Sequence, residues 1–240
     1  MMTGSKTVPS VLAGGLSRRS FVVGAAAALA ACQSERVAQT SGGAVLAQAN
    51  TGSFDPALMS MYGPMPNEKF PMEAIDLSYV DPRFYREVVD TPPNIKSKPG
   101  NIVVSPGTRY LYYVMEDGKS MRYGVGVGRT GFGWSGDAVI RRKETWPTWT
   151  PPPEMVKRDP LAAPFANGMP GGLDNPLGAR AMYLYQGDND TLYRVHGTTE
   201  PWTIGQAVSS GCIRLINHDV IDLYNRVALG TSVKVLSDVA

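Results

Sequence analysis

From about residue 100 onward, apolar and polar positions fall into short runs separated by turn-forming residues. Residues 102–104, 110–115 and 120–127 are rich in β-branched and aromatic side chains, which favour strands. The second and third of these runs are joined across Glu116-Asp117-Gly118-Lys119. This Asp-Gly pair predicts a tight hairpin, because both central positions of the favoured turn need a positive φ.

The same pattern continues toward the C-terminus. Residues 138–144 predict another strand, residues 181–185 and 191–196 predict a second hairpin across 186–190, and residues 232–236 predict a final strand. The chain therefore reads as a mainly β domain over residues 100–238.

Helical signals are fewer. Residues 155–167 favour a short helix, and Asn217 is a suitable N-cap for a longer one that ends before Gly230. The longer helix carries an apolar stripe at helical spacing, formed by Val220, Leu223, Tyr224 and Val227. One notable helix is thus expected after residue 216.

Three segments of different composition precede this domain. Residues 70–99 predict a small N-terminal appendage with a helix-like stretch at 82–89, and residues 32–69 are rich in Ser, Gly, Ala and Gln, which predicts a flexible tether. In residues 1–31, Arg18-Arg19 precede an apolar run too short to span a bilayer. Residues 1–31 therefore predict a cleavable signal peptide.

The end of this signal leaves alternatives open. The paired arginines favour the Tat export route, with an ordinary Sec signal as the alternative. Leu29-Ala30-Ala31-Cys32 resembles a lipobox, in which Cys32 is lipidated and anchors the protein to the membrane, whereas cleavage after Ala30 gives a soluble product. Both routes predict an exported protein of the periplasm.

Charge and cysteine content narrow the possible functions. Residues 1–31 hold three of the 23 basic residues and none of the 21 acidic ones, so the remaining chain has 20 basic against 21 acidic residues. That balance argues against a nucleic-acid partner. The chain has two cysteines, Cys32 and Cys212, and lipidation or removal of Cys32 leaves Cys212 alone. A single unpaired thiol in an oxidising compartment indicates a reactive role for that cysteine.

Cys212 and His196 are the candidate reactive pair. The chain has only two histidines, and His196 ends a predicted strand that can lie beside the Cys212 segment. A thiol needs a nearby base, Gly211 leaves room for backbone N–H groups to hold an oxyanion, and Arg214 can hold a carboxylate. There are also plainer interpretations: a lone buried cysteine is usually a small apolar side chain, Arg214 can pair with Asp219 or Asp222, and His218 is expected to face water.

A long motif carries a resemblance to a known family. It runs through His196-Gly197-Thr198, Ser209-Ser210-Gly211-Cys212-Ile213-Arg214-Leu215, Asn217, Asp219, Asp222-Leu223-Tyr224 and Gly230-Thr231. This string resembles the catalytic signature of the L,D-transpeptidase family, with a YkuD-type domain over roughly residues 100–236. Upstream, Pro147 to Pro152 and Asn175-Pro176-Leu177-Gly178 are also similar to segments of the family.

The resemblance implies a β-sandwich-like fold with a reactive cysteine in a groove under a mobile flap. It makes Cys212 the nucleophile and His196 the base, with Ser209, Ser210, Gly211 and Gly197 shaping the oxyanion site and groove. Arg214 matches a substrate-binding position. Ser210 stands where many members carry a second histidine, which affects proton transfer or acceptor positioning.

The implied reaction is peptidoglycan crosslinking. A thioester formed on Cys212 from a stem tetrapeptide passes to an amine of a second stem, giving a 3–3 crosslink without a cofactor or metal. Water as acceptor makes the protein an L,D-carboxypeptidase, and a protein lysine makes it an enzyme of lipoprotein attachment. A wall-binding lipoprotein without activity and a general cysteine protease are the further alternatives.

Overall fold

The computed structural model describes residues 55–129 and 133–237. They belong to a compact unit that runs from Thr51 to Ala240. The predictions of a signal peptide, of lipidation at Cys32 and of a tether up to residue 54 lie outside the described residues. Within 55–129 and 133–237, no helix is long and apolar enough to cross a membrane.

A mixed sheet of nine strands dominates the described chain, in the order β1-β4-β3-β2-β11-β6-β7-β8-β10. The last strand in sequence, β11, lies at its centre, parallel to β2 and antiparallel to β6. The strands are β1 (Glu87–Asp90), β2 (Ile102–Ser105), β3 (Tyr110–Val114), β4 (Lys119–Gly124), β6 (Gly136–Thr145), β7 (Arg180–Gln186), β8 (Asn189–His196), β10 (Ile213–Arg214) and β11 (Ser232–Val235). A small parallel pair joins β5 (Val127–Gly128) to β9 (Ala207–Ser209).

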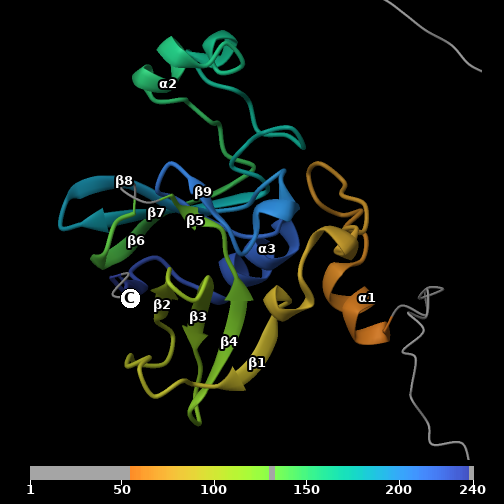
Figure 1. The fold of residues 1–240 in the computed structure, drawn as a ribbon, viewed down its shortest axis with the longest axis vertical. Coiled ribbons are helices and arrows are strands. Elements are labelled where there is room, and N and C mark those ends of the chain that lie inside the picture. The colour runs from red at the N-terminus through yellow and green to blue at the C-terminus, as the bar shows by residue number, and fades with distance from the viewer. Residues whose placement is uncertain (1–54, 130–132, 238–240) are drawn as a thin grey trace, which may run out of the picture. The chain divides into compact units, whose positions relative to one another are not determined.

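The two halves of the sheet form two layers around one core. In Figure 1, β6, β7 and β8 lie across the upper part of the domain, and β2, β3 and β4 run steeply below them. The main core draws apolar side chains from both halves and from helix α3 (Asn217–Arg226), including Leu111, Tyr123, Leu184 and Leu223. The prediction of a mainly β, sandwich-like domain with one helix after Cys212 is confirmed.

The predicted hairpins are present. The β3–β4 turn has positive φ at Asp117 (58°) and Gly118 (70°), as the Asp-Gly signal requires. The β7–β8 hairpin is longer than expected, because β8 already begins at Asn189. Its register shifts between Tyr183 and Tyr185, where β8 carries a bulge.

The helix expected over 82–89 is wrong. A 3₁₀ turn at Pro82–Phe84 is followed by β1, which pairs with the edge of β4. The free edge of β4 offers this segment backbone hydrogen bonds that its local pattern did not reveal. Short helical elements elsewhere are α1 (Pro56–Tyr62), α2 (Pro153–Arg158) and 3₁₀ turns at Leu77–Tyr79, Ala163–Phe165 and Pro201–Thr203.

The tether prediction is wrong for residues 55–69. Helix α1 ends in Tyr62, which is buried with Val80, Phe84, Ile204 and Ile216 in a second apolar cluster. This N-terminal segment, residues 55–98, therefore packs on the body of the domain. The apolar side chains that hold it are spread among polar residues, so its composition resembled that of a linker.

The N-cap prediction for Asn217 is also wrong. Ile216 precedes the first turn of α3, and the Asn217 Oδ1 accepts a hydrogen bond from the N–H of Ala179 at 2.9 Å. A Cβ atom on either Gly178 or Gly197 would lie 2.2 Å from this oxygen. Asn217 thus fastens the start of α3 to the beginning of β7 and to the end of β8.

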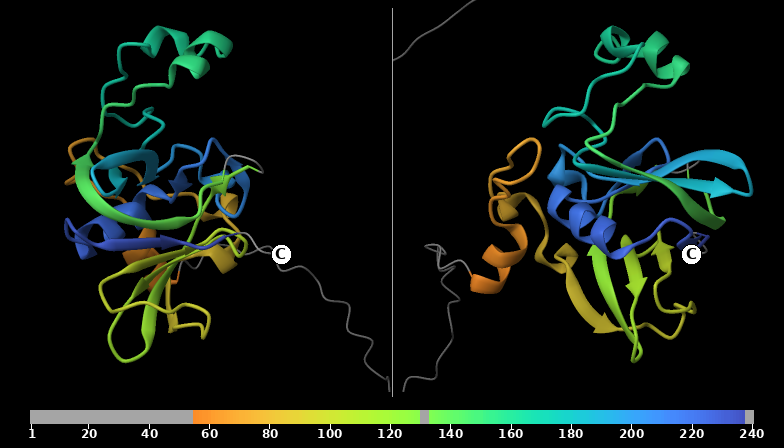
Figure 2. Two further views of the ribbon diagram at one scale, coloured as in Figure 1. Left: turned by 90° about the vertical axis from the view of Figure 1, so that its left-hand side faces the viewer. Right: turned by 180° about the vertical axis from the view of Figure 1, so that it is seen from behind.

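The segment between β6 and β7 forms an arm that carries α2. It projects away from the sheet in all three ribbon views (Figures 1 and 2). Trp149 and Met169 pair across it, and the Asn175 side chain donates to the carbonyl oxygens of Pro147, Met169 and Pro170. The base of the arm is therefore closed by one backbone bridge and by the side chain of Asn175.

Candidate active site

Strand pairing brings together the two segments that carry the candidate reactive residues. Strands β8 and β10 are parallel, with Val195 opposite Ile213 and His196 opposite Arg214. The N–H of Leu215 donates to the carbonyl oxygen of His196 at 2.9 Å. Cys212 directly precedes β10 and therefore lies beside β8, as expected from the sequence.

His196 is buried at the end of β8. Its Nδ1 lies 2.6 Å from the carbonyl oxygen of Gly197. A carbonyl only accepts, so Nδ1 carries the proton and Nε2 is left as the basic nitrogen. Burial lowers the pKa of His196 to about 4, with smaller contributions in the same direction from the guanidinium groups of Arg214 and Arg194, and the Gly197 bond opposes them. The imidazole is therefore neutral at neutral pH.

Cys212 is half-buried, and its Sγ lies 3.9 Å from the carbonyl oxygen of Leu192. Burial raises the pKa of its thiol, while the backbone N–H and guanidinium of Arg194 and the guanidinium of Arg214 act in the opposite direction. Near neutral pH the Cys212 thiol and the His196 imidazole are therefore both in their neutral forms.

The turn before Cys212 is tied by Ser209. The Ser209 Oγ donates to the carbonyl oxygen of Cys212 at 2.7 Å and accepts from the N–H of Gly211 at 3.1 Å. Gly211 has φ 125°, a conformation that side chains rarely adopt, which explains glycine at this position. Ser210 is exposed. Since the Gly211 N–H is engaged by Ser209, the N–H of Cys212 becomes the better candidate for holding an oxyanion.

Arg214 does not pair with the carboxylates of α3. Its Nη1 donates to Glu200 Oε2 at 3.0 Å, in the loop that follows His196. Asp219 and Asp222 face Arg86 of the N-terminal segment instead, at 3.4 and 3.7 Å. The expected pairing is therefore wrong, because Arg86 of the N-terminal segment faces both carboxylates and Arg226 of the same helix binds Asp222 at 2.8 Å.

The expectation that His218 faces water is wrong as well. His218 is buried, and its Nε2 lies 2.8 Å from the carbonyl oxygen of Gly63. Its ring also meets Tyr62 edge to face. The face of α3 that a helix pattern alone leaves to solvent is covered by the N-terminal segment.

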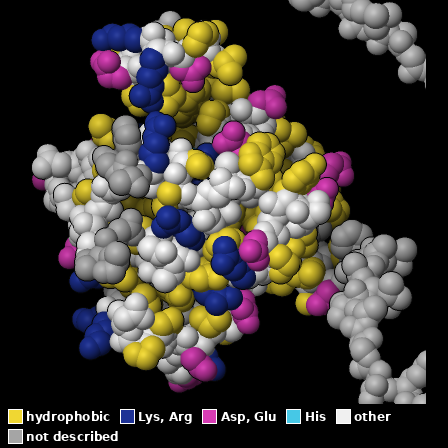
Figure 3. All heavy atoms as spheres, in the orientation of Figure 1, with side chains coloured by type: hydrophobic (Ala, Val, Ile, Leu, Met, Phe, Trp, Pro, Cys, Tyr) yellow, Lys and Arg dark blue, Asp and Glu magenta, His cyan; other side chains and the backbone are white. Residues whose placement is uncertain are grey.

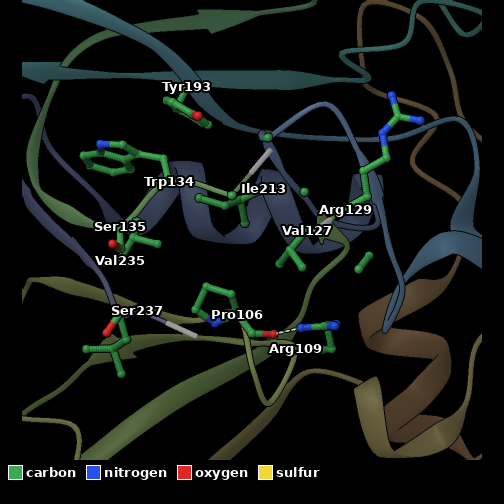
Figure 4. Close-up of a pocket in the computed structure, with 15 residues that line it drawn as sticks. Pro106, Arg109, Val127, Arg129, Trp134, Ser135, Tyr193, Ile213, Val235 and Ser237 are labelled. Carbon is green, nitrogen blue, oxygen red and sulfur yellow. Dashed lines mark hydrogen bonds between the residues drawn. The ribbon is translucent and has the colours of Figure 1, made fainter. Parts of the chain in front are cut away.

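A cavity of about 340 Å³ opens beside Gly211 (Figure 4). Trp134 and Tyr193 stack on one side of it, with ring centroids 5.4 Å apart. Arg109, whose guanidinium donates to Pro106, and Arg129 contribute cationic groups to its lining. Lys and Arg side chains are scattered among apolar ones across the middle of the face seen in Figure 3. The cavity lining thus combines two stacked aromatic rings with arginine side chains.

Four residues around the site had no signal in the sequence. Asp190, Leu192 and Arg194 contact one another or Cys212 only because β8 carries a bulge, and Glu200 meets Arg214 across 14 residues of chain. The Asp190–Arg194 spacing would have been a signal on a helix, but on a regular strand these two side chains lie well apart. Among the described residues, no three His, Cys, Asp or Glu side chains are grouped as a metal site.

Known proteins and a family model match the region of the chain that contains this site. A family model described as the L,D-transpeptidase catalytic domain, YkuD, matches residues 99–235. The chain is 37% identical over 142 residues to the probable L,D-transpeptidase ErfK/SrfK of Escherichia coli K12, covering 56% of this chain and 43% of that protein. It is 33% identical over 144 residues to the probable L,D-transpeptidase YbiS of the same strain, covering 58% and 45%. The chain thus spans less than half the length of these relatives.

One solved structure, from Brucella melitensis, is named a probable carnitine operon oxidoreductase caia. It is 49% identical and covers 67% of this chain and 99% of its own, with a TM-score of 0.45. At that TM-score the likeness carries no argument about activity.

Proposed function

Because this chain belongs to the YkuD family of L,D-transpeptidase catalytic domains, we propose that it is a peptidoglycan L,D-transpeptidase with Cys212 as nucleophile and His196 as general base. The observation that carries the proposal is the parallel pairing of β8 with β10, which sets the Cys212 segment beside a histidine whose Nδ1 is held by Gly197. Its Nε2 is then the nitrogen that accepts the thiol proton.

Acylation follows from this arrangement. His196 Nε2 takes the proton of Cys212, and Sγ attacks the carbonyl on the L-centre of the diamino acid in a stem tetrapeptide. The C–N bond to the terminal D-Ala breaks, and the imidazolium returns its proton to the leaving amine. The thioester keeps the acyl group reactive without ATP. The Cys212 N–H is the donor that we assign to the developing oxyanion.

Deacylation decides the product. The side-chain amine of a second stem attacks the thioester, His196 takes the amine proton, and Cys212 leaves as the thiol, which gives a 3–3 crosslink. Water in place of the amine gives an L,D-carboxypeptidase, and a protein lysine gives lipoprotein attachment. Arg214 is assigned to a substrate carboxylate, which would compete with Glu200 for its Nη1.

The cellular part of the proposal rests on the leader. Arg18-Arg19 and the apolar run after them direct export to the periplasm, and Cys32 would carry a lipid anchor. Peptidoglycan stem peptides are the partners that this location makes available. Metabolic labelling with a fatty acid, with Cys32→Ser as control, tests the anchor.

The first test is the intact mass of the full chain after incubation with a carbapenem, which mimics the acyl donor. We expect one adduct per chain, retained in Cys32→Ser and lost in Cys212→Ala. Digestion of muropeptides with the same proteins then identifies the acceptor. A folded protein with a free Cys212 thiol and no adduct would instead indicate a wall-binding protein without activity, and the mechanism above would be withdrawn.

A further inference from the structure

Strand β8 is distorted where it passes Cys212. Its pairing with β7 places Tyr183 opposite Arg194 and Tyr185 opposite Asp190, so the three residues 191–193 of β8 oppose a single residue of β7. Within this bulge, Leu192 has φ 62°. A left-handed conformation is unfavourable for a residue other than glycine. The Leu192 side chain is 75% exposed, so its own burial does not offset that cost.

Polar contacts hold the bulge in this shape. The Asp190 Oδ1 accepts from the N–H of Leu192 at 2.8 Å. The Thr191 Oγ1 donates to Leu184 O at 2.7 Å and accepts from the N–H of Tyr193 at 3.2 Å. Arg194 closes the set, because its two terminal nitrogens bind the two carboxylate oxygens of Asp190 at 2.7 and 2.8 Å.

The guanidinium of Arg194 is fixed from a second side. It lies over the ring of Tyr183, 4.4 Å from the ring centroid, and its side chain is largely buried. A bidentate, stacked arginine loses little freedom and is not replaceable by lysine. Arg194 therefore ties the end of the bulge to both Asp190 and β7.

The bulge places two backbone groups next to the sulfur atom of Cys212. The bulge turns the Leu192 carbonyl toward Sγ, at 3.9 Å, and the N–H of Arg194 faces the same sulfur. One group accepts from the thiol and the other donates to the thiolate, so the sulfur has a backbone partner in both protonation states. Strain kept in place by a polar network beside a reactive group is a common property of functional sites.

We propose that Arg194, clamped by Asp190, is a positioning residue that acts on Cys212 through the bulge of β8. The role in catalysis rests on the proposed function, whereas the effect on the thiol does not. Once the proton has left, the guanidinium of Arg194 also favours the thiolate, and the carboxylate of Asp190 opposes it. The pair thereby sets both the place and the charge state of the sulfur.

The test measures the rate of alkylation of Cys212 by iodoacetamide across the range from about pH 6 to about pH 10, in the full-length protein with peptide-resolved mass spectrometry. Arg194→Met is expected to raise the apparent pKa of the thiol and to slow alkylation near neutral pH roughly 3- to 10-fold, which corresponds to half to one pKa unit. Arg194→Lys keeps the charge and is expected to recover the profile in part. A merely structural role would not move this pH profile.

Asp190→Asn separates charge from geometry. Loss of the carboxylate favours the thiolate, so alkylation near neutral pH is expected to become faster, while acylation by a carbapenem slows because the bulge is no longer held. Arg142→Met is the matched control, since Arg142 lies over the same Tyr183 ring at 4.4 Å and contacts Glu144 instead of the bulge. It is expected to leave both measurements unchanged.

The proposal is overturned if the profile of Arg194→Met coincides with that of the parent, or if Arg142→Met shifts it equally. Thermal denaturation reports whether each variant is folded. Should Arg194→Met not fold, Arg194→Lys and Asp190→Asn still decide the question. If the variants shift the alkylation profile as expected but the parent forms no carbapenem adduct, the positioning role of Arg194 stands and the proposed function is wrong.

Discussion

His196 and Cys212 are both held in their neutral forms near pH 7, and burial is the main cause for each. Nearby arginines lower the pKa of both groups, because a cation disfavours the imidazolium and favours the thiolate. They therefore support the neutral form of His196 and oppose the neutral form of Cys212. In the proposed mechanism, the proton would thus leave the thiol only during the reaction. The residues that tune it, Arg194 and Arg214, come from the two paired strands β8 and β10.

The role of His196 can be separated from the intrinsic reactivity of the thiol. His196→Gln is expected to lower the rate of carbapenem acylation at neutral pH roughly 10²- to 10⁴-fold, because no base remains for the thiol proton. Alkylation by iodoacetamide at high pH should change little, since hydroxide then removes the proton. Equal losses in both assays would mean that His196 supports the structure and not proton transfer.

The depressed pKa of His196 also predicts a pH dependence of stability. The unfolded histidine titrates near 6.5 and the folded one at about 4, so between these values the unfolded state binds more protons. The free energy of unfolding should therefore fall as the pH falls from about 6.5 to about 4. Urea denaturation of parent and His196→Gln at several pH values checks this: the difference between the two proteins should change with pH below about 6.5 and become independent of pH above about pH 7.

At the scale of elements, the site depends on where β8, α3 and the arm meet. Asn217 Oδ1 contacts the start of β7, and Gly178 and Gly197 have no room for a Cβ atom beside it. Because the carbonyl oxygen of Gly197 also binds His196 Nδ1, this contact links the start of the helix to the orientation of the His196 ring. The absence of a side chain at Gly197 is what allows this approach.

Removal of the Asn217 side chain leaves the Ala179 N–H without its acceptor. Asn217→Ala is expected to lower the free energy of unfolding by about 1–3 kcal/mol, measured by denaturant titration. Asn225→Ala, at an exposed position of the same helix, is the control and should cost less than about 0.5 kcal/mol. Similar losses in the two variants would contradict the importance of this contact.

At the scale of the whole molecule, the N-terminal segment is part of the folded unit, although it precedes the region that the family model matches. Phe84 fills the space that glycine leaves at Gly124 and Gly205, where a Cβ atom would lie 2.4 and 2.1 Å from it. Earlier in the segment, Glu68 pairs with Arg180 at 2.6 Å. These contacts extend from the lower sheet layer to the base of the arm.

A chain that starts at residue 100 should therefore be far less stable than one that starts at residue 55. Phe84→Ala in the full-length protein removes one buried side chain of the segment and is expected to lower the free energy of unfolding by about 3–5 kcal/mol. Denaturant titration measures the variants that fold, and solubility reports on the truncated chains. Equal stability of the two truncated chains would show that the segment is dispensable.

The local sequence pattern was sufficient to predict many of the secondary-structure elements of this protein. Strand positions, the Asp117-Gly118 turn and the helix after residue 216 follow from alternation, turn chemistry and helical spacing, which are properties of neighbouring residues. The candidate pair His196 and Cys212 could likewise be identified from the sequence, because the chain has only two cysteines and two histidines to choose from. The side-by-side placement of the two followed from the strand that ends at His196.

Tertiary structure alone decided the partners. His218 is buried, Arg214 binds Glu200 and Asn217 contacts Ala179 because segments distant in sequence supply the other half of each contact. The bulge in β8 has the same origin, since register depends on both paired strands. Dihedral preference and alternation describe what a segment can form, whereas the packing of the whole chain determines which groups lie beside it.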